Sequence, residues 1–199
     1  MEEIPDEDLM MRFQRGNTAA FDLLFDRYRR PVFSFLYRML NRDRHCAEDL
    51  LQEVFIKLAK AAEFYRPSAR FASWIFAIAR NQCLNFIKSR RYLQGRRTVS
   101  LDKEGVESEA PLLDDPALRS AGPGNADLQE RIEWAVASLP ETYREVFILK
   151  AVEGFSHDEI AGMLERNTAT VRTQYHRARL MLRKRTGPCR IPDRQEGRR

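Results

Sequence analysis

The chain has 199 residues, of which 43% are hydrophobic, and its 34 basic and 29 acidic side chains give a net charge of +5. This length and apolar content suffice for the cores of one or two small domains. No apolar run approaches the roughly 20 residues that a membrane span needs, and the acidic N-terminus is unlike a secretory signal. We therefore expect a cytoplasmic protein without membrane insertion.

The cysteines and histidines exclude several classes of site. Cys46, Cys83 and Cys189 lie far apart, and only three histidines accompany them, so neither a disulfide framework nor a zinc site is expected. No grouping of His, Cys, Ser and carboxylate residues suggests a nucleophile, a base or a metal site. The sequence thus predicts no catalytic residue, no metal and no cofactor.

Helical periodicity dominates the N-terminal part, and no stretch alternates with the two-residue period of a strand. Asp6 is a candidate N-cap for a short helix that runs through Gln14. Asn17 or Thr18 is a candidate N-cap for a longer second helix, in which Pro31 removes one backbone donor and could introduce a kink.

The third helix is predicted from about Cys46 to Ala62, with most of its apolar residues on one arc that faces a core. Ile56 lies off this arc, within a surface formed by Asp49, Gln52 and Glu53. An apolar side chain in such a surface suits contact with another protein. A solvated face with one exposed isoleucine explains the same pattern.

The fourth helix, predicted over about residues 71–91, combines amide, aromatic and basic side chains. Residues 66–101 contain eight bases and no acid. Amides can bond base edges, an aromatic ring can stack on an unpaired base, and bases can hold phosphates, which predicts a surface for single-stranded nucleic acid. The alternative places the tryptophan in the core and leaves the asparagines solvated. The residues of this surface are Trp74, Arg80, Asn81, Asn85 and Lys88.

Residues 92–127 interrupt the periodicity with glycines and prolines, and predict a flexible acidic linker. Within it, residues 102–127 hold seven acids and two bases. The basic, acidic, basic order along the chain suggests two nucleic-acid surfaces that the linker separates. We expect helical domains at residues 1–91 and 128–185, and a disordered tail at 186–199.

The second domain ends in a helix-turn-helix pattern. Pro140 favours the start of a helix that runs through Glu153, and Gly154 ends it. Ser156 and Glu159 then form a capping box for the next helix. A short polar turn follows Leu164, after which Asn167 or Thr168 can cap the last helix.

The last helix separates its apolar stripe from its positive charge. Val171, Tyr175, Ala178 and Leu182 form the stripe. The other side presents Arg172, Thr173, His176 and Arg177 toward base edges of a major groove, while Arg179 is better placed for phosphate. Residues 165–185 hold seven bases and one acid. An ordinary solvated basic helix is the alternative, but the capped helix-turn-helix spacing favours a reader of duplex DNA.

This combination resembles the extracytoplasmic-function (ECF, group IV) sigma factors of bacterial RNA polymerase. GNTAAFDLLFDRYRRPVFSFLYRML at 16–40 looks like the opening region-two helix, and AEDLLQEVFIKLAK at 47–60 is close to the family's most specific signature. FASWIFAIARNQCLNFIKSRRY matches the promoter-melting segment. LPETYREVFILKAVEGFSHDEIAGML and TVRTQYHRAR match region four. The resemblance covers nearly the whole chain and implies an all-α fold of two small helical domains.

The resemblance also implies partners. The surface with Asp49, Gln52, Glu53 and Ile56 would dock on the clamp helices of the largest polymerase subunit, and region four would engage the flap of the second-largest subunit. The fourth helix, with the loop at 64–70, would read the −10 element and open the promoter, and the last helix would read the −35 element. A transcription initiation factor acting in a stress response is implied, with no enzymatic activity and with an anti-sigma factor as a further partner.

Two adjacent positions depart from the family pattern, and two other classes of protein stay open. Glu165 and Arg166 stand in the turn where a glycine and an apolar residue are usual. A conventional helix-turn-helix regulator would bind a palindromic duplex as a dimer without polymerase. A helical adaptor that binds only proteins would show no steep dependence of DNA affinity on salt.

Overall fold

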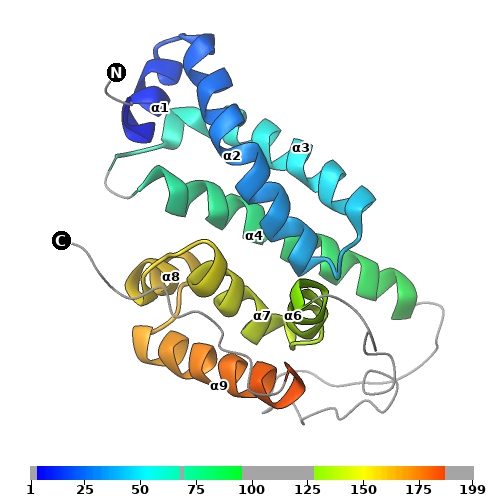
Figure 1. Cartoon of the computed structure of the whole chain (residues 1–199). Coiled ribbons are helices and arrows are strands. Elements are labelled where there is room, and N and C mark those ends of the chain that lie inside the picture. Colours follow the sequence, from blue (N-terminus) through cyan, green and yellow to red (C-terminus); the bar gives the residue numbers. More distant parts are fainter. Residues whose placement is uncertain (1–3, 68–69, 96–127, 187–199) are drawn as a thin grey trace.

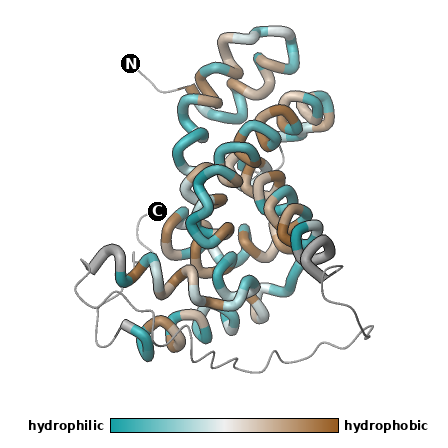
Figure 2. The backbone as a smooth tube through the Cα atoms, turned by 90° about the vertical axis from the view of Figure 1, so that its right-hand side faces the viewer, coloured by the Kyte–Doolittle hydropathy of each residue, from teal (hydrophilic) through white to brown (hydrophobic). Residues whose placement is uncertain are grey.

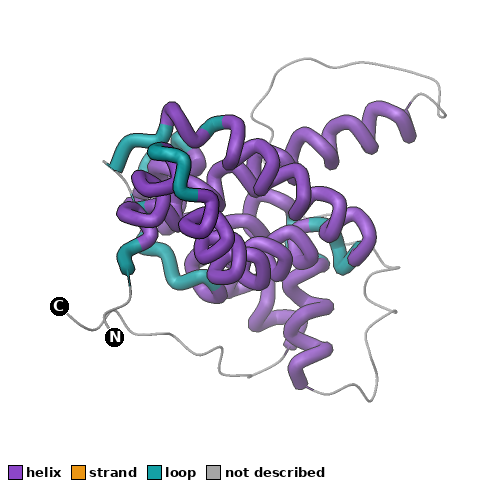
Figure 3. The backbone as a smooth tube through the Cα atoms, turned by 90° about the horizontal axis from the view of Figure 1, so that it is seen from above, coloured by secondary structure: helices purple, strands orange, loops and turns teal. Residues whose placement is uncertain are grey.

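The computed structural model describes residues 4–67, 70–95 and 128–186, and every regular element within these ranges is helical (Figures 1 and 3). The all-α prediction is confirmed. Most of the predicted linker, at 96–127, lies outside the described residues, as does the tail from 187 with Cys189.

The first four helices form an N-terminal bundle. They are α1 (Asp6–Gln14), α2 (Thr18–Met39), α3 (Arg44–Lys60) and α4 (Phe71–Gly95), with a 3-10 turn η1 (Ala62–Phe64) after α3. α2 packs against the other three and continues as one helix through Pro31. Hydrophobic and hydrophilic residues recur along each helix (Figure 2), as expected for helices that bury one face and expose the other. Leu24, Phe35, Val54, Phe71 and Ile75 are fully buried in this core.

The structure confirms one predicted cap in this bundle and corrects another. Asn17 caps α2 as predicted, because its Oδ1 accepts a hydrogen bond from the backbone N–H of Ala20 at 3.3 Å. The prediction that Asp6 caps α1 is wrong, since Pro5 is the N-cap residue. Asp6 lies in the first turn, and its carboxylate accepts hydrogen bonds at 2.5 Å from Arg27 and from Tyr28 on α2. An acid in a first turn can serve a neighbouring helix in this way and still favour its own.

The later helices form a C-terminal bundle below the first (Figure 1). They are α6 (Leu128–Ala137), α7 (Glu141–Phe147), a π-helical turn η2 (Ile148–Val152), α8 (His157–Leu164) and α9 (Thr168–Thr186). The single helix predicted from Pro140 to Glu153 is present, with its last residues, 148–152, in π-helical geometry, and Gly154 follows it at φ +80°.

The predicted helix-turn-helix caps are present. Ser156 Oγ accepts from the backbone N–H of Glu159 at 3.1 Å, and the Glu159 carboxylate accepts from the backbone N–H of Ser156 at 2.8 Å. Asn167 caps α9 by accepting from the backbone N–H of Ala169 at 2.8 Å. Val171, Ala178 and Leu182 are buried as predicted, and Tyr175 is half-buried.

The turn between α8 and α9 keeps a left-handed backbone despite its unusual sequence. Glu165 has φ +52° and ψ +43°, which is the left-handed region that favours glycine. The turn forms nevertheless, and Arg166 directs its guanidinium back to the Glu145 carboxylate at 2.7 Å. The departure from the family pattern therefore adds backbone strain and leaves the helix-turn-helix intact.

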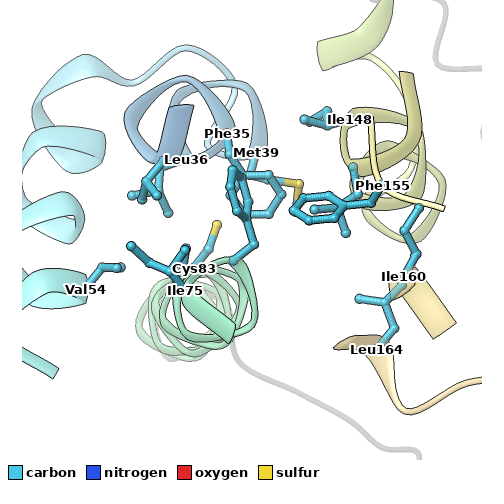
Figure 4. Packing of buried hydrophobic residues seen from close by; sticks show 14 of the residues in the cluster. Phe35, Leu36, Met39, Val54, Ile75, Cys83, Ile148, Phe155, Ile160 and Leu164 are labelled. Carbon is cyan, nitrogen blue, oxygen red and sulfur yellow. The ribbon is translucent and has the colours of Figure 1, made fainter. Parts of the chain in front are cut away.

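The two bundles share one continuous core. Figure 4 shows Phe155 directed toward Phe35 and Met39 of the N-terminal bundle, and its ring lies 5.2 Å from the Phe76 ring. The buried Arg144 guanidinium on α7 donates to the carbonyl oxygen of Met39 at 2.9 Å and to that of Leu139 at 2.8 Å. A buried guanidinium needs such acceptors, so Arg144 fixes the end of α2 against the α6–α7 turn.

Replacing Glu165 by glycine should raise the free energy of unfolding. A left-handed residue with a Cβ costs about 1–2 kcal/mol, and the greater freedom of glycine in the unfolded chain offsets part of this, which leaves a gain of roughly 0.5–1 kcal/mol. Urea denaturation measures the change. Glu165→Ala is the matched control, because it removes the same carboxylate and keeps the Cβ. Equal gains in both variants would contradict the backbone explanation.

Glu153, which follows η2, should make stability depend on pH. Burial raises its pKa from 4.5 to about 7, against the opposing effect of Arg38 on α2. The folded state thus binds a proton more tightly than the unfolded chain, so this contribution is full below pH 4.5 and is lost as the pH rises to 7. Glu153→Gln should match the wild type near pH 4.5 and exceed it by on the order of 1–2 kcal/mol at pH 8, after allowance for solvent screening. Thermal unfolding across this range gives the answer, and a difference that does not vary with pH would refute the assignment.

Candidate polymerase and nucleic-acid interfaces

The predicted protein-binding surface of α3 faces solvent. Ile56 is 53% exposed, whereas its neighbours Val54, Phe55 and Leu58 are buried. Asp49, Gln52 and Glu53 are exposed around it, and Asp49 lies 3.1 Å from His45 Nδ1. The structure brings the four predicted residues onto one face, which we call the α3 face.

A buried glutamine on α4 orients one carboxylate of the α3 face. Gln82 is 7% exposed and donates from Nε2 to Glu53 Oε2 at 2.9 Å, and its own Oε1 accepts a hydrogen bond from Lys57 Nζ. The sequence did not reveal Gln82, because its position on α4 carries no signal until α3 and α4 are packed together. Glu53 is therefore held in place by a side chain of the adjacent helix.

The predicted nucleic-acid surface of α4 is only partly free. Asn81, Asn85 and Lys88 are exposed. Trp74 is half-buried, with its ring 5.0 Å from Tyr65 and 6.0 Å from Phe71, so one part of it packs on the core and another part stays exposed.

Arg80 differs from the other residues of this surface. Its side chain is 17% exposed and donates to Glu145 Oε2 on α7 at 3.2 Å and to Asn81 Oδ1 at 3.2 Å. Glu145 is 2% exposed and also binds Arg166 at 2.7 Å. A carboxylate of the C-terminal bundle thus binds the Arg80 guanidinium, which the sequence assigned to DNA.

The loop between η1 and α4 carries a second such contact. Phe64 is 71% exposed, and Arg70 donates to the Glu159 carboxylate at 2.9 Å, while residues 68 and 69 of this loop lie outside the described part. Burial alone would raise the pKa of Glu159, but hydrogen bonds from Ser156 and Arg70 outweigh it and hold the pKa below its ordinary value. Glu159 is therefore anionic at neutral pH and serves both its own helix and the loop.

The outer face of α9 is open to solvent. Arg172, Thr173, His176 and Arg177 are all exposed, and Arg179 lies with its guanidinium 5.8 Å from the centre of the Tyr175 ring. Farther along α9, Arg185 donates to the carbonyl oxygen of Ser138 at 2.8 Å. The structure therefore presents the predicted base-reading residues together and draws Arg185 toward the end of α6.

Within the described ranges, no three His, Cys, Asp or Glu side chains are grouped so that they could hold a metal ion. None of the helices described is both long and apolar enough to cross a membrane. Cys83 is buried, and this burial raises the pKa of its thiol.

Comparison with known proteins identifies both bundles. Residues 24–92 match sigma-70 region 2, and residues 129–182 match sigma-70 region 4. These two regions in this order define a sigma factor of RNA polymerase.

Individual relatives match along most of the chain. It is 32% identical over 182 residues to the ECF RNA polymerase sigma-E factor of Escherichia coli K12, which covers 89% of this chain and 92% of the relative. It is 34% identical over 179 residues to the RNA polymerase sigma-H factor of Pseudomonas aeruginosa, with coverage of 87% and 90%. The chain belongs to the ECF sigma factors, which are transcription initiation factors and not catalysts.

Two solved structures share the fold. The sigma factor RpoE of Bartonella quintana, in complex with the anti-sigma factor NepR, has a TM-score of 0.66 at 22% identity, covering 85% of this chain and 98% of that one. CnrH in complex with the cytosolic domain of CnrY has a TM-score of 0.64 at 21% identity, with coverage of 90% and 95%. Both comparisons span the two bundles.

Stability measurements can test whether the α3 face is free of the core. Ile56→Ala should change the free energy of unfolding by less than about 0.5 kcal/mol, because the side chain is largely solvated. Leu58→Ala, two residues away and fully buried, should lower it by roughly 2–5 kcal/mol. Urea denaturation of both variants makes the comparison, and similar losses would show that Ile56 belongs to the core.

Proposed function

We propose that this ECF sigma factor binds core RNA polymerase through the α3 face. The observation that carries the proposal is the exposure of Ile56 at 53% within a ring of acidic and amide side chains, on a helix whose other large apolar side chains are buried or half-buried. An apolar centre with a polar rim is the usual anatomy of a protein interface. The resemblance to the family assigns this face to the clamp helices of the largest subunit.

We propose that α4 and the loop before it bind the −10 element as a single strand. Asn81 and Asn85 can bond base edges, and Trp74 can stack on a base that has left the duplex. Lys88, Arg80 and Arg70 would hold phosphates, and the acid-free stretch at 66–101 favours that role. Opening then begins where a base is captured outside the stack, at a cost of a few kcal/mol that these contacts offset.

The exposed face of α9 would read the −35 duplex. Arg172, Thr173, His176 and Arg177 would lie in the major groove, and Arg179 would contact the backbone. The earlier helices of the C-terminal bundle would engage the flap of the second-largest subunit. Residues 1–91 and 128–185 would be the two functional units, as the sequence predicted.

An anti-sigma factor is a further proposed partner. The RpoE and CnrH structures were solved with NepR and with the cytosolic domain of CnrY. A partner of this kind would compete with polymerase for this chain. We place the protein in the cytoplasm, where its polymerase acts, and assign it no catalytic residue and no cofactor.

Glu53→Arg should weaken binding to core polymerase by about tenfold or more, because it reverses one charge in the polar rim around Ile56. Binding of the full chain to a −35 duplex should be unchanged. Co-elution with core polymerase and duplex titration measure the two effects.

Glu48→Arg is the matched control for this variant. Glu48 is on the same helix about a quarter turn from the centre of the face, where it pairs with Arg44 at 2.7 Å. Reversing the charge at position 48 should leave polymerase binding unchanged. Equal loss of polymerase and DNA binding in Glu53→Arg would show that the role assigned to this face is wrong.

Substitutions on α9 should separate base reading from phosphate binding. Arg172→Ala should cost roughly 1–3 kcal/mol for a cognate −35 duplex and relax the preference at one base pair. Arg179→Ala should weaken binding to all duplexes alike and reduce the slope of log K against log salt by about 0.9. Fluorescence anisotropy at several salt concentrations measures both. Sequence-independent loss in Arg172→Ala would contradict its place at a base edge.

A further inference from the structure

Glu145 joins three parts of the molecule through one buried carboxylate. Its side chain is 2% exposed and binds Arg80 of α4 at 3.2 Å and Arg166 of the α8–α9 turn at 2.7 Å. A carboxylate this deeply buried is stable as an anion only with such partners. Arg80 therefore pairs with the C-terminal bundle, whereas in the proposed function it pairs with a DNA phosphate.

Glu159 makes the second contact of this kind. Its carboxylate binds Arg70 at 2.9 Å while it also closes the capping box on Ser156. The stretch at 66–101 that contains Arg70 and Arg80 has no acid of its own, and both guanidiniums find carboxylates on the C-terminal bundle. These carboxylates take the place that phosphate oxygens would take in a complex with DNA.

Apolar contacts lie beside the two ion pairs. Phe155 and Phe76 are 4% and 3% exposed, with ring centres 5.2 Å apart, and α8 packs along α4. The base-reading face of α9, in contrast, is exposed. The arrangement therefore pairs two arginines of the α4 surface with carboxylates and leaves the α9 surface accessible.

We propose that the chain without polymerase is held closed by a carboxylate latch, in which Glu145 and Glu159 occupy Arg80 and Arg70 and keep them from the −10 strand. The inference rests on the proposed function, because it takes α4 as the −10 surface. The closed chain can meet a −35 duplex with α9, but it cannot place both arginines on DNA until the latch opens.

The size of a promoter gives the reason why opening must occur. Elements centred near −10 and −35 are about 25 base pairs apart, roughly 85 Å along B-DNA. A compact chain of 199 residues has a radius of gyration of only about 16 Å. The two bundles must separate to occupy both elements, and separation frees Arg70 and Arg80 at the moment when phosphates become available to them.

The test compares the full-length wild type with Glu145→Gln, Glu159→Gln and the double variant. Glutamine keeps the shape of each side chain, and at position 159 it also keeps the capping box. Glu48→Gln is the matched control, since it removes a charge from a pair outside the latch. Small-angle X-ray scattering reports the radius of gyration, and anisotropy reports the affinity for fluorescein-labelled (dT)12.

The double variant should have a larger radius of gyration than the wild type and bind (dT)12 about tenfold more tightly, because apparent affinity scales with the fraction of open chains. Binding of a −35 duplex should not change, and Glu48→Gln should match the wild type in every measurement. A double variant with the size and the (dT)12 affinity of the wild type would overturn the latch. So would an expanded variant with no gain in (dT)12 affinity.

Circular dichroism shows whether Glu145→Gln has a folding defect. If its helix content falls, Glu159→Gln alone decides: a gain in (dT)12 affinity supports the latch, and an unchanged affinity overturns it. Failure of the proposed function has a different signature, namely a wild-type chain that does not bind core polymerase, whatever its radius of gyration.

Discussion

The arrangement of the whole molecule depends on one buried carboxylate, that of Glu145 on the short helix α7. Removing one partner from a buried ion pair typically costs about 3–5 kcal/mol, because the remaining charge stays uncompensated. Arg80 comes from region 2 and Arg166 from the turn before α9, so this requirement fixes α7, α4 and the helix-turn-helix relative to one another. The neighbouring Arg144 is buried too and holds the end of α2 through the Met39 carbonyl oxygen. Two adjacent charges on one helix thus fasten region 4 to two different helices of region 2.

The need to compensate the buried Glu145 carboxylate also gives a physical reason for Arg166 in the turn before α9. A glycine at the position of Glu165 would adopt the left-handed conformation without strain. The next residue, Arg166, needs to reach back to Glu145, and its guanidinium supplies the charge that a buried carboxylate requires. The strain at φ +52°, about 1–2 kcal/mol, is smaller than the roughly 3–5 kcal/mol that removing one partner of a buried ion pair costs. The turn therefore combines an unfavourable backbone with a favourable ion pair, and the recognition helix keeps its exposed face.

Much of the fold could be predicted from the sequence, because caps and apolar spacing are local signals. The capping box at Ser156, the cap at Asn17 and the apolar stripe of α9 depend only on residues within about three helical turns of each other. The prediction that Asp6 caps α1 was wrong because an acid in the first turn and an N-cap residue look alike in sequence until the partner on α2 is known. The exposure of Ile56 followed from helical projection, whereas the burial of Arg80 could not, since its partner Glu145 is 65 residues away. Gln82 was missed for the same reason. Interactions between helices distant in sequence leave no periodic pattern.

The central claim is that one chain directs polymerase to defined starting points by binding two promoter elements, one with each of its helical bundles. The most direct measurement maps the 5′ ends of transcripts made from a genomic DNA library by core polymerase with and without the full-length protein. The account predicts a set of discrete new start sites that share two sequence elements at a fixed spacing, present only when the protein is added. Transcripts whose 5′ ends are the same with and without the protein would contradict it.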